Sequence, residues 1–485
     1  MAKKDVPNAK TPITTTITNE HNYGTWPSSE PESCETSPPS ELSILVASSS
    51  PLVIGITLQF SQVAIALLFV GRLGKDELAA TSLACLTANV TGWAVLQGLS
   101  SALDTLCPQA FGAGLKKVVG LHVQRMAVML ICVSFAVGCF WYNSFSFQRL
   151  LIPNDDICRL SRDFLRILLL GCPGYACFEC GKRLLQAQGH FSAGLYTMLF
   201  CIPLHVFLTW YSVLHLGLGM KGAAISMAVV HTLLPFGLVI YSKIFTSGEC
   251  WPKITKHTFE NWMPMIKLAI PSLAMLEVEC IGFEILTLLA GQMGTAELCA
   301  QTLLVTFCGF IYKIPYSLAI AASTQIAERI GEGSHQKAKE TAKLAISLAV
   351  GFGSVLIVLL LLFRNKIPYL FTNDPSVVVL MFSVVPMIAV FQLADAIVGV
   401  TNGIIRGIGK QYIGAWIQTL GYYVVGLPCS IGTAFGLGWK LNGLWAGISV
   451  AMLLICCLEG TYMYFLDWTG LVEDAKERND AERDV

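Results

Sequence analysis

Apolar runs recur along the whole chain, and short polar segments separate them. A helix needs about 20 apolar residues to cross the hydrocarbon of a bilayer, and each run is near that length. We therefore predict an all-α membrane protein with about twelve transmembrane helices, with cores near 43–67, 78–105, 120–142, 160–182, 192–216, 222–245, 262–290, 296–322, 340–362, 376–400, 411–435 and 440–465.

The two ends of the chain and one internal segment are polar. Residues 1–41 are rich in Thr, Ser, Pro and Glu and have no apolar period, which predicts a disordered cytosolic tail. Residues 467–485 form a second, charged tail, which we expect to be solvated in the cytosol. The polar segment 247–261 predicts a cytosolic linker. It divides an N-lobe (42–246, spans 1–6) from a C-lobe (262–466, spans 7–12).

Lys and Arg are more frequent in the loops that would face the cytosol if both termini lie there. Lys182 and Arg183 count among these loop charges. The positive-inside rule thus predicts that both termini are cytosolic.

The two predicted lobes resemble one another in sequence. The segment VGRLGKDELAATSL (70–83) aligns with AGQMGTAELCAQTL (290–303), and QAFGAG from Gln109 aligns with ERIGEG from Glu328. Pro51 and Pro271 are separated by the same interval of about 220 residues. A repeat of six spans keeps its orientation in the membrane, so the lobes are parallel copies. Transporters built from such copies hold substrate between them and expose it to each side in turn.

Composition and charge exclude several other classes. The 485-residue chain is 54% hydrophobic and 13% charged, whereas soluble domains carry about 25% charged residues. Its formal net charge of zero gives no indication of a nucleic-acid partner. Most of the 17 cysteines lie in apolar runs, where Cys acts as a small buried apolar residue, so we expect no metal site.

Carboxylates inside two apolar runs are the strongest functional signal. Glu277, Glu279 and Glu284 lie in AMLEVECIGFEILTLLAG, and Asp395 lies in AVFQLADAIVG. An ionised acid at the bilayer centre costs roughly 2.5–3.5 kcal/mol, so such residues usually serve function. At 100° per residue, Glu277 and Glu284 share a helix face and Glu279 points elsewhere. In the alternative interpretation the acids only pair with a buried base, for which Lys313 is the candidate.

Four further motifs resemble the multidrug and toxic compound extrusion (MATE) family. They are SALDTLCPQAFGAG, RLLQAQG, AIPS and GIIRGIGKQ, and the resemblance covers nearly all of 42–466. The family lies in a superfamily that also holds lipid-linked oligosaccharide flippases, and LDTLCPQAFGAG is most similar to eukaryotic, fungal members. The resemblance implies two six-helix lobes around a V-shaped cleft, and antiport of H⁺ or Na⁺ against organic, often cationic, compounds.

The resemblance also implies roles for single residues. Glu279, Glu284 and Asp395 match the positions that couple transport to protons. Span one has no acid, whereas bacterial relatives carry an aspartate there, and this argues against Na⁺ and against an N-lobe cation site. Candidates to line a substrate cleft, or else to form helix–helix hydrogen bonds, are Gln59, Asn89, Gln97, Glu277, Tyr312 and Lys313. Candidates for gate or lobe-packing turns are Gln109, Gly112, Gly114, Arg406 and Gly407.

The sequence therefore predicts a secondary antiporter that exports small organic compounds or toxins in exchange for H⁺ by alternating access. It has no nucleotide motif, so we expect no cofactor besides the coupling ion. We expect a monomer whose partners are its substrates and the lipid bilayer, in the plasma or the vacuolar membrane. One alternative is a flippase of the same superfamily. Another is a membrane-embedded acid enzyme, although no catalytic motif of that kind is present.

Overall fold

The computed structural model describes residues 40–151 and 154–483. All regular elements in these residues are helices, and Glu41–Val485 forms one compact unit. The all-α prediction is confirmed for the described residues. The predicted disorder of residues 1–41 falls almost entirely outside them.

The N-terminal half is built from helices that are often interrupted. Its elements are α1 (Glu41–Val70), α2 (Lys75–Ala88), the π-helical η1 (Asn89–Trp93), α3 (Ala94–Ser100), α4 (Leu103–Gly112), α5 (Lys116–Tyr142), α6 (Ser144–Leu151), α7 (Asp155–Leu168), η2 (Leu169–Gly171), α8 (Cys172–Ala187), α9 (Ala193–Trp210), the π-helical η3 (Tyr211–His215) and α10 (Gly219–Phe245).

The C-terminal half has longer continuous helices. After the short η4 (Lys256–Phe259) come α11 (Met263–Met293), α12 (Thr295–Gly331), α13 (His335–Phe363), η5 (Pro368–Leu370), α14 (Pro375–Gly407), α15 (Gln411–Thr419), η6 (Leu420–Gly426), α16 (Leu427–Ile431), η7 (Gly432–Gly436), α17 (Lys440–Tyr464) and α18 (Trp468–Asp480).

Ten helical segments among the described residues are long and apolar enough to cross a membrane. Two more of the expected spans are also helical, although they fall outside those ten. One is α11, which carries Lys267 and three glutamates and is therefore less apolar. The other runs from Gln411 to Gly436 as an unbroken series of α and π segments.

The sequence repeat is visible in the backbone. Gly114 and Gly333 occupy equivalent turns and have φ values of +76° and +81°, a left-handed conformation that glycine adopts without a steric penalty. Spans five and eleven both end in a π-helical segment, η3 and η7 respectively. Equivalent stretches of sequence thus fold into equivalent local structures in the two lobes.

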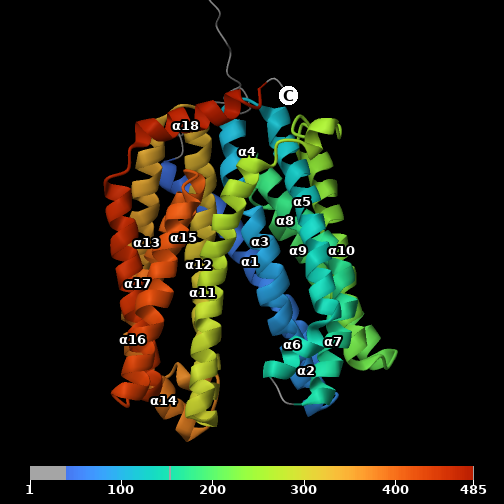
Figure 1. The fold of residues 1–485 in the computed structure, drawn as a ribbon, viewed down its shortest axis with the longest axis vertical. Helices are drawn as coiled ribbons and strands as arrows, with labels where there is room; N and C mark the ends of the chain where they lie inside the picture. The colour runs from blue at the N-terminus through green and yellow to red at the C-terminus, as the bar shows by residue number, and fades with distance from the viewer. Residues whose placement is uncertain (1–39, 152–153, 484–485) are drawn as a thin grey trace, which may run out of the picture. The chain divides into compact units, whose positions relative to one another are not determined.

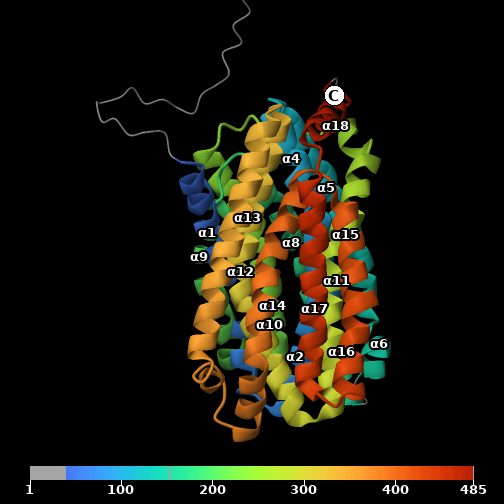
Figure 2. The same ribbon diagram turned by 90° about the vertical axis from the view of Figure 1, so that its left-hand side faces the viewer.

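Within Glu41–Val485 the two halves meet at one end of the helices, close to α18 (Figure 1). There α4 and α1 pack against α12, and α3 packs against α11. Toward the opposite end the ribbons of the two halves lie apart (Figure 1). We call these the α18 end and the far end. The quarter-turn view places α13, α14, α17 and α15 along the side of the C-lobe and α18 above them (Figure 2).

The charged C-terminal tail is not solvated throughout, so that expectation is wrong. Asp467 caps α18, and hydrogen bonds from Thr469 hold the pKa of its carboxyl below the usual value. Trp468 and Asn479 lie at the two ends of a buried stripe with helical spacing. Because the residues between these buried positions are mostly charged or polar, the sequence does not show a clear apolar helix face here.

Beyond α18, Glu482 is buried and forms an ion pair of 2.8 Å with Arg125 of α5. Asn261, the last residue of the predicted linker, donates a hydrogen bond of 2.8 Å to the same carboxylate oxygen. The end of the chain therefore links the C-lobe to α5 and to the linker.

Candidate functional site

Glu279 and Asp395 lie close enough to interact electrostatically. Glu279 projects from α11 and is half-buried, while Asp395 of α14 is only 4% exposed. Neither carboxylate has an ion-pair partner within 4.0 Å among the described residues. Two acids without a direct counter-ion thus lie within electrostatic range of each other in the C-lobe.

Aromatic and basic groups surround this pair. Tyr312 of α12 lies near both acids and packs on Gly399, where an added Cβ would come within 3.0 Å of its ring. Glycine at this position lets the phenol approach α14. Lys313 lies within electrostatic range of Glu279, but its ammonium rests over the ring of Phe60, 4.6 Å from the centroid, and forms no ion pair in the described residues.

The other two glutamates of α11 lie on a different face of the helix from Glu279. Glu277 is close to Tyr423 of η6, and no hydrogen bond reaches its buried Oε1 within the part of the chain that the structure describes. Glu284 is half-buried. The structure therefore groups Glu279, but not Glu277 or Glu284, with Asp395.

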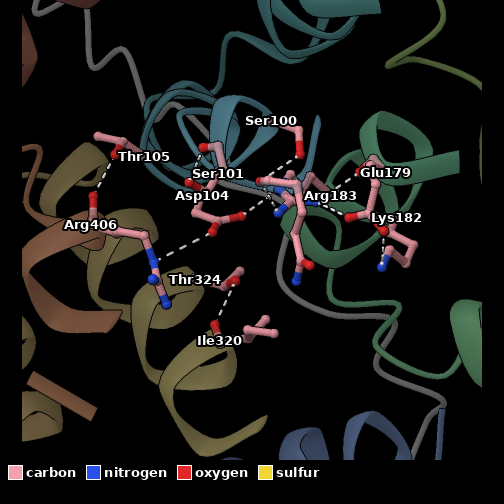
Figure 3. Close-up of polar contacts among 12 residues, drawn as sticks. Ser100, Ser101, Asp104, Thr105, Glu179, Lys182, Arg183, Ile320, Thr324 and Arg406 are labelled. Atoms are coloured by element: carbon pink, nitrogen blue, oxygen red, sulfur yellow. Dashed lines mark hydrogen bonds and ion pairs between the residues drawn. The ribbon is translucent and has the colours of Figure 1, made fainter. Parts of the chain in front are cut away.

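A second charged cluster lies in the N-lobe, on α8 and α4 (Figure 3). The fully buried Glu179 forms ion pairs of 2.7 Å with Lys182 and with Arg183. Arg183 also lies 3.0 Å from Asp104. Gln59 of α1 joins the cluster: it donates to Glu179 at 3.2 Å and accepts from Lys182 at 3.1 Å. We call Asp104, Glu179, Lys182 and Arg183 the N-lobe ion cluster.

The N-lobe ion cluster reaches across to the C-lobe. The guanidinium of Arg406 lies 3.8 Å from Asp104, and the carbonyl of Arg406 accepts a hydrogen bond from Thr105 (Figure 3). Two carboxylates thus face three basic side chains. Their charge is already compensated, so this cluster has no need of a bound cation.

Most of the predicted turn residues come together where the lobes meet. Gln109 donates to the carbonyl of Gly407 at 3.0 Å and accepts from Arg478 of α18 at 2.9 Å. Gln97, from the set of cleft candidates, donates to the hydroxyl of Tyr316 at 2.8 Å, also across the lobes. Asn89 does not join them. Its side chain is exposed and forms no hydrogen bond with the other candidates among the described residues.

Sequence reasoning misses part of this chemistry. Lys182 and Arg183 do not lie in a cytosolic loop, as assumed in the charge count, but inside α8, with side chains 14% and 7% exposed. The sequence does not single out Glu179 or the fully buried Glu459 of α17 as candidates. The available signal was Glu179 with basic residues three and four positions later in an apolar run, which is the spacing of ion pairs on one helix face.

The chain is similar to known proteins over most of its length. The family model described as MatE matches residues 51–211 and 271–431, two segments that begin 220 residues apart, as the internal repeat requires. "Uncharacterized transporter C4B3.13" of Schizosaccharomyces pombe is 34% identical over 91% of this chain and 82% of its own length. "Multidrug and toxin extrusion protein 2" of Mus musculus is 31% identical over 90% of this chain and 77% of its own length.

A solved structure has the same fold. The crystal structure of the eukaryotic MATE transporter AtDTX14 matches with a TM-score of 0.84 and 29% identity, over 90% of this chain and 99% of that one. The match extends through both lobes, so the two-lobe architecture expected from the sequence is confirmed.

Proposed function

We propose that this chain, which belongs to the MatE family of transporters, exports small organic, often cationic, compounds in exchange for H⁺. The family and the transport of multidrug and toxin type follow from its relatives. The coupling ion, the coupling residues and the alternation between two sides are the proposed part.

One contrast between the lobes carries the proposal. In the N-lobe ion cluster, both Asp104 and Glu179 have ion-pair partners. In the C-lobe, Glu279 and Asp395 have none within 4.0 Å in the described residues. An acid paired with Arg stays ionised, whereas two unpaired acids in a poorly solvated place favour protonation of one of them. We therefore assign proton binding to Glu279 and Asp395 of the C-lobe.

The same pair explains competition between proton and substrate. When Glu279 and Asp395 are ionised, they attract an organic cation; when they hold a proton, that attraction falls. Binding of H⁺ from one side would therefore release a cationic compound on that side. Tyr312 adds an aromatic face beside the acids, suited to the apolar part of such a compound.

Alternating access is supported by the way the lobes meet. Contacts between them include Gln97 with Tyr316 and, at the α18 end, Gln109 with Gly407. Arg406 also forms a long ion pair with Asp104, and Arg329 forms one of 2.8 Å with Glu41; a rocking motion of the two parallel halves can exchange such polar contacts. If both termini are cytosolic, this conformation is closed toward the cytosol.

The test uses purified protein in liposomes loaded with a fluorescent organic cation. A pH jump should drive transport and a Na⁺ jump should not. Glu279→Gln should abolish pH-driven transport, because the amide cannot bind or release a proton. Glu340→Gln, which neutralises an exposed glutamate of α13, is the matched control and should transport normally. Transport driven by Na⁺ alone, or normal transport by Glu279→Gln, would overturn the proposal.

Neither alternative from the sequence is favoured. Two relatives, from Mus musculus and Xenopus tropicalis, are named as multidrug and toxin extrusion proteins. The family match also favours transport over enzymatic use of the paired acids.

A further inference from the structure

A third buried acid lies in the C-lobe, behind the Glu279–Asp395 pair. Glu459 of α17 is fully buried, and its Oε2 shares a hydrogen bond with the hydroxyl of Thr401 on α14. Its Oε1 has no hydrogen-bond partner, and Glu459 has no ion pair in the described residues. An ionised carboxylate with one buried, unsolvated oxygen would be costly, so the site suits a neutral acid.

The hydrogen bonds of Thr401 point to the same protonation state. Its hydroxyl lies 3.1 Å from the carbonyl oxygen of Ile397, 3.0 Å from that of Val398, and in contact with Glu459. A hydroxyl has one hydrogen and can also accept. If Glu459 carries a proton, it donates to Thr401, and Thr401 donates to a carbonyl of its own helix. If Glu459 is ionised, Thr401 must give up that second bond.

Glu459 also lies on a route away from the proton-binding pair. Thr401 follows Asp395 by six residues on α14, about 9 Å along the helix toward the α18 end. Glu459 is five residues from the end of α17, the helix that leads into α18. The acid is therefore placed between the pair and the α18 end.

The groups around Glu459 include both signs of charge. Glu459 lies within electrostatic range of Glu279 on α11 and of Arg406 on α14. Cys456 lies one turn away on α17 itself, and Tyr422 of η6 packs on α17 through Met452. A negative charge on Glu279 favours the protonated form of Glu459, while Arg406 favours the ionised form. The acid is thus electrostatically linked to the pair.

We propose that Glu459 is a proton-transfer residue that takes the proton from the Glu279–Asp395 pair and releases it at the α18 end. When the α18 end opens, the O–H bond of the neutral Glu459 breaks and its proton passes to water. The O–H bond of one acid of the pair then breaks, and a new O–H bond forms on the Glu459 carboxylate, which returns Glu459 to its neutral form. The pair is left ionised and ready for a cationic substrate. This inference rests on the proposed H⁺ antiport.

The experiment compares two transport modes in the same liposomes. Net efflux driven by a pH gradient requires proton release, whereas exchange of labelled for unlabelled substrate without a gradient does not. Glu459→Gln should slow pH-driven efflux by roughly 100-fold or more, the usual effect of losing a proton-transfer group. Exchange should remain near the wild-type rate, because Gln can donate to Thr401 as the protonated acid does. Glu459→Asp, which keeps an acid, should restore much of the pH-driven efflux.

The outcomes separate this inference from the proposed function. If pH drives the wild type and Glu459→Gln equally well, Glu459 transfers no proton, while the antiport proposal stands. If Glu459→Gln loses exchange together with efflux, and Asp restores neither, the residue only holds α14 and α17 together and the inference is wrong. If pH does not drive the wild type at all, the proposed function fails, and proton transfer by Glu459 fails with it.

Discussion

Gly112 and Gly331 are equivalent residues of the two halves, and they pack against each other's turns. A Cβ added to Gly112 would lie 2.0 Å from the carbonyl oxygen of Glu328, and one added to Gly331 would lie 2.1 Å from the carbonyl oxygen of Gln109. Gln109 and Glu328 are themselves equivalent in the repeat. The contact is therefore symmetric, and it brings α4 and α12 together at the α18 end.

Alanine at Gly112 should weaken this contact. Backbone atoms cannot move aside as a flexible side chain can, so α4 and α12 must separate, at a cost of about 1–3 kcal/mol for an overpacked site. We expect a lower thermal midpoint in detergent, followed by tryptophan fluorescence, for Gly112→Ala and for Gly331→Ala alike. Gly351→Ala in α13 is the matched control, since no neighbouring atom would lie within 4 Å of the added Cβ. Equal midpoints for all three variants would show that the close approach is absent in solution.

The sequence predicts Gly112 as a turn residue and aligns Gly331 with it, but it does not predict the contact between the two glycines. The repeat aligns Gly112 with Gly331 because both copies keep the same local pattern. That pattern describes one half, whereas the contact depends on how the halves dock. The docking of the halves depends on many individually weak side-chain contacts. One is the contact between Phe60 and Phe310, whose ring centroids lie 5.4 Å apart. Such contacts produce no periodic pattern in the sequence.

Neutralising a buried acid should lower thermal stability in the N-lobe ion cluster but should leave it unchanged at Glu279 in the C-lobe. Glu179→Gln would leave Lys182 and Arg183 buried with less compensation, and breaking a buried ion pair costs roughly 3–5 kcal/mol. Glu279→Gln breaks no ion pair within 4.0 Å among the described residues, so the protein should keep its thermal midpoint while losing pH-driven transport. If both variants unfold at the same temperature, the distinction between a structural N-lobe cluster and a functional C-lobe pair is wrong.

This distinction also marks the limit of sequence reasoning for the site. Glu279 and Asp395 lie in apolar runs that contain no basic residue, and they are therefore conspicuous. Glu179 is followed by two basic residues, and such a group is easily taken for the end of a span. Only the structure shows that α8 continues through it and that Asp104 completes the cluster from another helix. An acid inside a membrane span can be recognised from its neighbours in the sequence. The basic residues that balance its charge can come from distant parts of the chain, and the sequence does not show them.

The ion pair between Arg125 and Glu482 should hold the C-terminal segment in place. Arg125 is 2% exposed and donates at 2.8 Å to Glu482 and at 3.0 Å to the carbonyl of His257. Glu482→Ala would leave a buried guanidinium without its counter-ion, again at roughly 3–5 kcal/mol. We expect faster proteolysis of the segment after residue 466 and a lower thermal midpoint. Arg483→Ala is the control. It removes a neighbouring charge that is 70% exposed and should change neither the rate of proteolysis nor the thermal midpoint. If Glu482→Ala is cleaved no faster than this control, the ion pair does not hold the segment in place.

Asp395→Asn tests whether this acid acts on the same proton and the same substrate as Glu279. Without the negative charge on Asp395, the like-charge repulsion between the two acids is lost, so proton binding at the remaining acid, Glu279, is less favoured and the curve of transport against pH should move toward acid pH. Burial still favours the neutral acid at Glu279, so transport should be reduced rather than lost. A cationic substrate should bind more weakly because one attractive charge has gone, while a neutral substrate should be affected less. Efflux of one cationic and one neutral compound across a pH series, in wild type and variant, measures both effects. An unshifted curve with equal losses for the two compounds would mean that Asp395 serves helix packing alone.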